Sequence, residues 1–154
     1  MITVTAAIIE KDGLVLAARR KPGRHLAGYW EFPGGKLEPE ETEKECLARE
    51  LLEEFDILCI VGDFFAESIC EYETPPGKEE DCFPPNKPAN IPQDTKVIRL
   101  LSYHVRHQSG VFQCRDHDMI VWLPVDELQS LKWSPADVPL VKKLQEEYHI
   151  GDDT

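Results

Sequence analysis

An acidic amphipathic segment that follows a Gly-Gly turn most constrains how this chain folds. In the stretch TEKECLARELLEEF (residues 42–55), apolar side chains recur at helical spacing: Leu47, Ala48, Leu51, Leu52 and Phe55. Thr42 is followed three residues later by Glu45, which is the pattern of a capping box at a helix start. The segment therefore predicts a helix over residues 42–55 whose apolar face packs on a core.

The other face of this helix is crowded with carboxylates. Between Glu38 and Glu54 the chain has eight glutamates in seventeen residues, offset only by Lys44 and Arg49. At about 100° per residue, four of them project within about 100° of one another: Glu43, Glu50, Glu53 and Glu54. Carboxylates on a rigid helix are suitable ligands for Mg²⁺ or Mn²⁺, but acidic helix faces that are simply solvated are also common. The helix alone leaves both interpretations open.

The composition is that of one globular domain covering residues 1–154. The chain is 42% hydrophobic, and its net charge of -12 argues against a nucleic-acid-binding surface. No apolar run approaches the roughly 18 residues of a membrane span, and the N-terminus lacks a signal-peptide pattern. Five cysteines without a C-x-x-C pair favour free thiols in a reducing cytoplasm. We therefore expect a cytoplasmic protein, a monomer or homodimer, without membrane or nucleic-acid partners.

The rest of the chain alternates strands, loops and further helices. Strands are predicted at residues 3–10, 14–20, 30–32, 57–73, 96–108 and 119–125, and helices at 126–131 and 136–148. Residues 33–41 are predicted to form a loop, and Asp12-Gly13 a hairpin turn. The segment at about 74–95 holds six of the twelve prolines, which predicts either a lid or a mobile insertion.

The spacing from Gly35 to Ile57 resembles the Nudix box. The chain reads G-x5-E-x7-R-E-L-L-E-E-x-x-I, and the box reads G-x5-E-x7-R-E-U-x-E-E-x-G-U, where U is bulky and aliphatic. Only Asp56 departs, at the glycine that follows the helix. A left-handed conformation is usual at that position, so the departure concerns local stability rather than chemistry.

The resemblance extends over nearly the whole chain apart from the Pro-rich segment. AAIIEKDGLVLAARR, GYWEFPGGK and SPADVPLVKKL look like the corresponding parts of MutT-type nucleoside triphosphate pyrophosphohydrolases. This implies an α/β fold, an α/β/α sandwich with a mixed β-sheet. It also implies Mg²⁺-dependent hydrolysis of a (deoxy)nucleoside triphosphate, of the 8-oxo-dGTP or CTP type, to nucleoside monophosphate and pyrophosphate, in nucleotide-pool sanitation.

Two alternatives remain at this point. One is a Nudix hydrolase of a nucleotide sugar such as ADP-ribose, and the other is an inactive Nudix-fold module that senses nucleotides. Such modules usually lose box carboxylates, whereas Glu50, Glu53 and Glu54 are all present. The sequence therefore favours an enzyme.

The resemblance implies roles for individual residues. The metal ligands would be the Gly34 carbonyl, Glu50, Glu53 and Glu54. Glu50 or Glu53 would act as general base, with Arg49 as its orienter. Asp116, six positions before Trp122, is either an accessory base or ligand, or an ordinary loop residue. Substrate contacts are expected at Arg20, His25, Glu31, Phe32, Pro33, Gly34 and Asp137, although Arg20 and His25 could be incidental.

Asp137, in SPADVP, stands where the MutT 8-oxo-dGTP enzyme has asparagine. An ionised carboxylate only accepts hydrogen bonds, so it would suit the amino group of cytosine or the N–H groups of a turned guanine. A protonated Asp137 could also donate. The remaining interpretation is an N-cap for the last helix.

Overall fold

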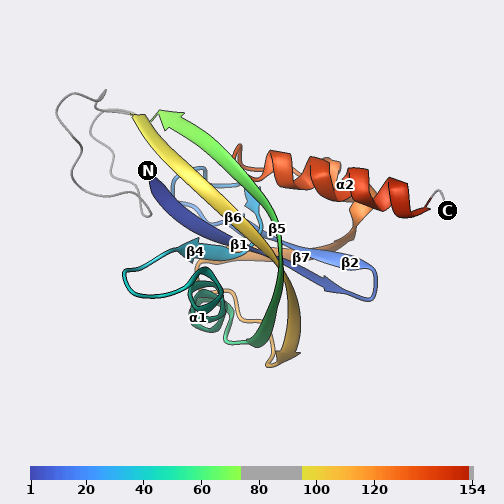
Figure 1. Cartoon of the computed structure of the whole chain (residues 1–154), viewed down its shortest axis with the longest axis horizontal. Helices are drawn as coiled ribbons and strands as arrows, with labels where there is room; N and C mark the ends of the chain where they lie inside the picture. Colours follow the sequence, from blue (N-terminus) through green and yellow to red (C-terminus); the bar gives the residue numbers. More distant parts are fainter. Residues whose placement is uncertain (74–94, 153–154) are drawn as a thin grey trace.

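The computed structural model describes residues 1–73 and 95–152, and it has a β-sheet with one helix on each face (Figure 1). In chain order the elements are β1 (Ile2–Lys11), β2 (Leu14–Arg20), β3 (Trp30–Glu31), β4 (Gly34–Lys36), α1 (Glu43–Phe55), β5 (Leu58–Glu73), β6 (Thr95–Ser109), β7 (His117–Pro124), the 3₁₀ helix η1 (Val125–Ser130) and α2 (Val138–Asp152). This arrangement confirms the expected α/β/α sandwich.

The sheet is mixed, because one of its central pairs is parallel. The strand order is β3-β2-β1-β6-β5, with β4 paired to β1 and β7 paired to β2. β1 and β6 run parallel, and the other pairs are antiparallel. The β1–β2 hairpin turns at Asp12 and Gly13, both with positive φ (54° and 80°), as the Asp-Gly pair predicts.

Both faces of the sheet are buried, since side chains alternate along β1. Ile8 belongs to the same core cluster as Leu140 of α2, whereas Ile9 belongs to a second cluster with Leu51 of α1. All four side chains are fully buried. The apolar stripe of α1 is therefore anchored on the sheet, and its polar face is left for other contacts.

Residues 34–36 form a strand, so the prediction of a continuous loop over residues 33–41 was wrong there. β4 pairs antiparallel with β1 through Val4↔Lys36, Thr5↔Gly35 and Ala6↔Gly34. Glycine is unfavourable in strands, which hides β4 from sequence patterns. Backbone pairing holds it instead, and Thr5 Oγ1 adds a hydrogen bond to the Gly35 carbonyl at 3.1 Å. The Gly-Gly segment is thus part of the sheet.

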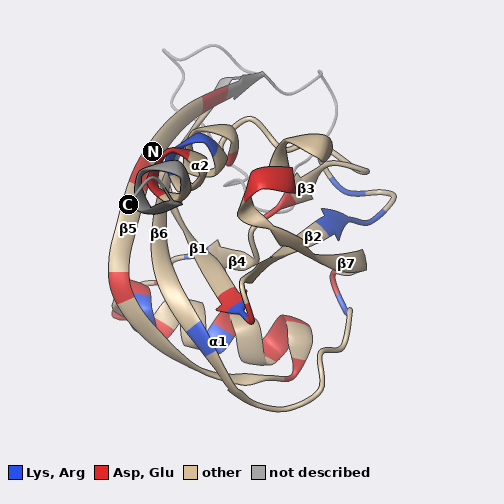
Figure 2. Ribbon diagram, turned by 90° about the vertical axis from the view of Figure 1, so that its right-hand side faces the viewer, with Lys and Arg blue, Asp and Glu red and all other residues tan. Residues whose placement is uncertain are grey.

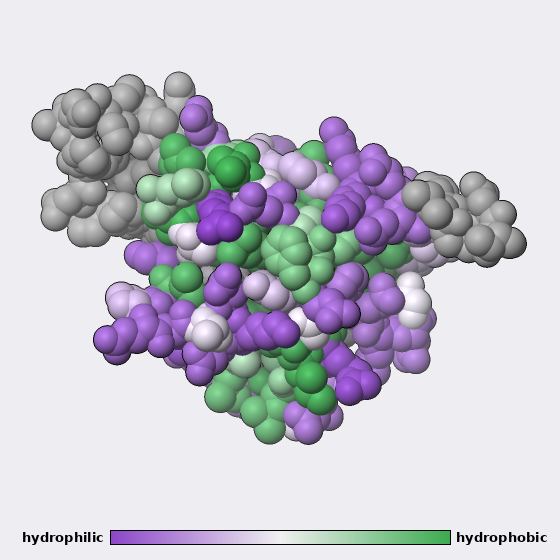
Figure 3. Space-filling view, viewed as in Figure 1, coloured by the Kyte–Doolittle hydropathy of each residue, from purple (hydrophilic) through white to green (hydrophobic). Residues whose placement is uncertain are grey.

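The edge strand β5 carries exposed apolar side chains. Leu58, Ile60, Phe64 and Ile69 are all at least 44% exposed. Figure 3 shows apolar patches among hydrophilic residues along the course of β5 and β6. No β5 residue lines the cavity described below, so the site does not depend on what covers this edge.

Other expectations concern residues outside the described part. Within the described residues, Cys46, Cys59, Cys70 and Cys114 form no disulfide, while Cys82 lies outside this part of the chain. The Pro-rich segment also lies outside them, apart from Thr95, the first residue of β6. Of the helices described, none is long and apolar enough to cross a membrane.

Asp56 ends α1 in the left-handed conformation that the family's glycine would adopt. Its φ is 59° and its ψ 38°, and its N–H donates to the Leu52 carbonyl at 3.0 Å. A side chain in this conformation crowds the following carbonyl, although Asp tolerates it better than most residues.

We expect Asp56→Gly to stabilise the protein by roughly 0.5–1 kcal/mol, because glycine adopts this conformation without steric cost. Urea denaturation measures the change. Lys44→Gly, at an exposed position in the first turn of α1, is the control and should destabilise by up to about 1 kcal/mol. A loss of stability in Asp56→Gly would show that the Asp56 side chain contributes more than its 3.8 Å ion pair with Arg115 suggests.

Candidate active site

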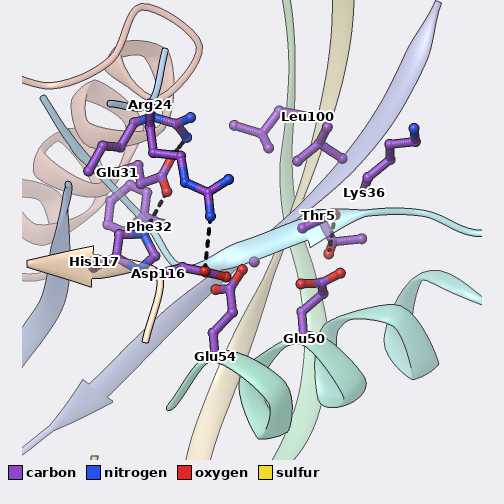
Figure 4. Close-up of a pocket in the computed structure, with 14 residues that line it drawn as sticks. Thr5, Arg24, Glu31, Phe32, Lys36, Glu50, Glu54, Leu100, Asp116 and His117 are labelled. Atoms are coloured by element: carbon purple, nitrogen blue, oxygen red, sulfur yellow. Dashed lines mark hydrogen bonds and ion pairs between the residues drawn. The ribbon is translucent and has the colours of Figure 1, made fainter. Parts of the chain in front are cut away.

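The carboxylates of Glu50 and Glu54, one turn apart on α1, face a cavity of about 250 Å³ (Figure 4). On the adjacent face of the helix, Leu47, Leu51 and Phe55 are fully buried. At the start of the helix the predicted capping box is present. The helix is therefore fixed at its start and along its length, which holds the two carboxylates in place.

Gly34 and Gly35 allow the backbone of β4 to approach this helix closely. A Cβ atom on Gly35 would lie 2.2 Å from the Glu50 side chain, and one on Gly34 would lie 1.9 Å from the Thr5 carbonyl oxygen. Neither position can accept a larger residue without displacing its neighbour. Both glycines line the cavity beside Glu50.

Arg49 binds several carboxylates at once. Its Nη2 atom donates to Glu41 at 2.7 Å, and its Nη1 atom donates to Glu50 at 2.9 Å and to Glu53 at 3.1 Å. The hydrogen bond from Arg49 lowers the pKa of Glu41 to about 2. Arg49 thus holds the Glu50 carboxylate by a direct hydrogen bond.

Glu54 lacks such compensation. Burial, together with the charges of Glu50, Glu31 and Asp116, raises its pKa far above the ordinary range. Burial likewise raises the pKa of Glu50, against the opposing effect of Arg49. Like charges this close favour retention of a proton by the Glu50–Glu54 pair in the absence of a cation.

The carboxylates at the cavity meet part of what a divalent cation requires. Among the described residues, no three or more Asp, Glu, His or Cys side chains are already arranged as a metal site. However, Glu54 Oε2 is buried without a hydrogen-bond partner in this part of the chain. A cation would supply both the missing partner and the missing charge, so Glu50 and Glu54 fit such a group. Glu53 does not line the cavity, and its side chain is 59% exposed.

Cationic side chains occupy the other parts of the cavity wall. Arg20 lies near Glu31, with its Nη1 atom 3.0 Å from Oε1. Arg24 lies near Asp116, with its Nη2 atom 3.3 Å from Oδ1 (Figure 4). Lys36 lines the cavity from β4. Figure 2 shows the acidic positions on α1 and the basic end of β2. The cavity therefore combines carboxylates with cations that suit an anionic ligand.

The structure brings together about half of the residues expected at the site. Those that line the cavity are Arg20, Glu31, Phe32, Gly34, Glu50, Glu54 and Asp116. His25, Pro33, Arg49, Glu53 and Asp137 are not among its lining residues. Sequence reasoning missed Arg24 and His117, which also line it. Arg24 is one basic residue in a loop and gives no periodic signal, whereas His117 directly follows Asp116.

Asp137 is buried behind the cavity wall. Its Oδ1 atom accepts from the Phe32 N–H at 3.1 Å, and its Oδ2 atom accepts from the Ser134 hydroxyl at 2.6 Å. Burial and the charge of Glu31 raise its pKa to about 7. The first turn of α2 is bonded to the backbone carbonyl of Asp137, through the N–H groups of Leu140 and Val141. The side chain thus ties α2 to the Glu31–Gly34 segment.

Comparison with known proteins agrees with this geometry. The profile of the NUDIX domain matches residues 1–144. The chain is 35% identical to the CTP pyrophosphohydrolase of Escherichia coli K12, over 92% of this chain and 90% of that protein. It is 39% identical to the 8-oxo-dGTP diphosphatase of the same strain, over 90% of this chain and 91% of that protein.

A solved structure has the same fold. The solution structure of the E. coli ORF135 protein superposes with a TM-score of 0.72, at 34% identity, over 95% of this chain and 89% of that one. Together with the box carboxylates on α1, these similarities show that the chain belongs to the Nudix hydrolase family and is a MutT-like nucleotide pyrophosphohydrolase.

Proposed function

We propose that the enzyme hydrolyses a free (deoxy)nucleoside triphosphate to the monophosphate and pyrophosphate in the cytoplasm, removing unwanted nucleotides from the pool. The observation that carries this proposal is the cavity in which Glu50 and Glu54 face Arg20, Arg24 and Lys36. The named relatives, a CTP pyrophosphohydrolase and an 8-oxo-dGTP diphosphatase, support a triphosphate substrate.

Glu50, Glu53, Glu54 and the Gly34 carbonyl would hold Mg²⁺, or Mn²⁺ in its place. A bound divalent cation neutralises phosphate charge and makes a bound water more acidic. Two observations support this assignment: Glu54 Oε2 has no hydrogen-bond partner among residues 1–73 and 95–152, and the pKa values of Glu50 and Glu54 are raised.

The chain's own groups supply positioning and proton transfer. Arg49 holds Glu50 at the cavity wall, which supports Glu50 as the base that takes a proton from the attacking water. Glu53 accepts from the same Arg49 nitrogen but is more exposed, which suits an outer ligand. Asp116 would be an accessory base or ligand. It would become available for this role when phosphate oxygens replace it as the hydrogen-bond partner of Arg24.

The phosphates and the base would occupy different parts of the cavity. Arg20, with Arg24 and Lys36, would bind phosphate oxygens, because guanidinium and ammonium groups match these anions. The Glu31–Gly34 segment and Asp137 would contact the base, with His25 supporting Arg20 through its carbonyl. An ionised Asp137 keeps acceptor capacity beyond its two present bonds.

A panel of nucleoside triphosphates and ADP-ribose, with pyrophosphate detection and Mg²⁺ present, tests the proposal. Pyrophosphate release from CTP, dCTP or 8-oxo-dGTP is the expected result. Turnover of ADP-ribose alone, or binding of nucleotides without turnover, would contradict it.

We expect Glu53→Gln to lower kcat by at least ~100-fold while the protein stays folded, because an exposed carboxylate of the metal site is lost. Steady-state kinetics with saturating Mg²⁺ measures the effect. Glu43→Gln, in the first turn of the same helix and away from the cavity, is the matched control and should retain normal turnover. Near-normal kcat in Glu53→Gln would remove this residue from the site.

The metal-free protein should lose stability as the pH rises. Burial and neighbouring charges raise the pKa of Glu54 from 4.5 to about 10. A carboxyl with a raised folded pKa stabilises the protein fully below its unfolded pKa of 4.5, and this contribution is lost as the pH rises toward 10. Mg²⁺ binds the ionised form, so it should raise Tm more at about pH 9 than at about pH 6.

Glu54→Gln is the control for this pH dependence. The amide cannot ionise, so the variant should show a flatter Tm profile and a smaller response to Mg²⁺. Thermal denaturation with and without Mg²⁺ measures both. Identical profiles for wild type and variant would show that Glu54 does not carry the effect.

We expect Asp137→Asn to change the ratio of kcat/KM between CTP-type and 8-oxo-dGTP-type substrates by roughly tenfold or more, because a misplaced buried hydrogen bond changes discrimination strongly. The amide oxygen can still accept from the Phe32 N–H, so the fold should survive. Asp126→Asn, at an exposed position of η1, is the control. Relative rates equal to those of the wild type would place base recognition elsewhere.

A further inference from the structure

His117 lines the cavity although its side chain is only 3% exposed. It is the first residue of β7 and lies opposite Arg20, next to an irregularity in the β2–β7 pairing. Its ring stacks on Phe55, with centroids 5.4 Å apart and planes inclined by 12°. Because Phe55 is the last residue of α1 and is fully buried, the imidazole is fixed against the end of α1, the helix that carries Glu50 and Glu54.

Two donors hold the two carboxylate oxygens of Glu31. His117 Nε2 lies 2.7 Å from Oε2, and Arg20 Nη1 donates to Oε1 at 3.0 Å. Burial raises the pKa of Glu31, but the hydrogen bond with His117 and the charge of Arg20 outweigh it, so the pKa lies below its usual value. An ionised carboxylate only accepts, so Nε2 carries the proton of this bond.

The other ring nitrogen indicates why histidine stands here. His117 Nδ1 is buried and has no hydrogen-bond partner among the described residues. An unpaired buried nitrogen is unfavourable, and phenylalanine would fill the same space against Phe55 without that cost. The favourable contribution specific to histidine at this position is therefore the Nε2 bond to Glu31.

We propose that His117 is a positioning residue for the substrate. It fixes the Glu31 carboxylate, and through that carboxylate the Arg20 guanidinium, at the cavity wall. The contact also links the wall opposite α1 to the end of α1 itself. This inference rests on the proposed function, because it requires a nucleoside triphosphate in the cavity. A histidine that only fills the core would instead tolerate phenylalanine.

Loss of the Nε2 bond should weaken binding more than chemistry. One oxygen of Glu31 would lose its donor, and Arg20 would then hold a carboxylate fixed at a single point. Within the described part of the chain, the imidazole makes no hydrogen bond with Arg49, Glu50 or Glu54, so proton transfer is not directly disturbed. We expect KM to rise roughly tenfold, with kcat within about threefold of the wild type.

Two substitutions separate the hydrogen bond from the packing. His117→Phe keeps an aromatic ring against Phe55 and removes the donor, whereas His117→Gln places an amide N–H near the position of Nε2. We would measure kcat and KM on the triphosphate panel, and Kd for a non-hydrolysable α,β-methylene triphosphate with Mg²⁺. His104→Phe, at an exposed position of β6 away from the cavity, is the matched control.

The expected result is a higher KM and Kd in His117→Phe, near-normal values in His117→Gln, and no change in His104→Phe. Wild-type KM and Kd in His117→Phe, or equal impairment in Phe and Gln variants, would overturn the inference. Thermal denaturation checks folding. If His117→Phe does not fold, His117→Asn replaces it, because the shorter asparagine amide cannot reach Glu31. We then expect a higher KM and Kd in His117→Asn than in His117→Gln. Equal values in the two variants would overturn the inference.

The same measurements separate this inference from the proposed function. A wild type that binds the analogue but hydrolyses no triphosphate would contradict the proposed function, and the Kd comparison would still decide the role of His117. A wild type that neither binds nor hydrolyses would overturn both. Hydrolysis by the wild type with no difference among the His117 variants would overturn the positioning role alone.

Discussion

The closeness of the half-buried Glu50 and Glu54 carboxyl groups, which cannot both ionise without a compensating cation, is the constraint on which the rest of the site depends. Two such groups are tolerated together because the adjacent apolar face of α1 is fully buried on the sheet and holds the helix in place. Arg49 compensates Glu50, but an oxygen of Glu54 finds no hydrogen-bond partner in the described part of the chain. The folded protein thus contains a locally unfavourable arrangement that a bound cation would relieve.

Local features of the site could be predicted from the sequence, and features that depend on distant segments could not. The capping box of α1 and the left-handed Asp56 follow from residues close together in the chain, and both are present. β4 could not be predicted, because its hydrogen bonds come from β1. The position of His117 was also hidden, since only the folded chain brings it against Glu31 and Phe55.

For Asp137, the family resemblance and the structure give different kinds of information. The resemblance identifies the position as one that could read a base. The structure shows a buried carboxylate bonded to the Phe32 N–H and to Ser134, outside the cavity lining. Its raised pKa of about 7 means that its charge changes near neutral pH. A base in contact with Asp137 would therefore meet an ionised carboxylate, which only accepts hydrogen bonds, or a protonated carboxyl, which also donates one.

The parallel pairing of β1 with β6 has a consequence for biosynthesis. Ile2 pairs with Ile98, so β1 leaves the ribosome about a hundred residues before its central neighbour β6 is available. Val4 from β1 and Leu100 from β6 both line the cavity, together with His117 from β7. Contacts between such distant segments form slowly, because closing long loops costs entropy. The nascent chain can therefore build α1 early, but it completes the cavity only after β7 has emerged.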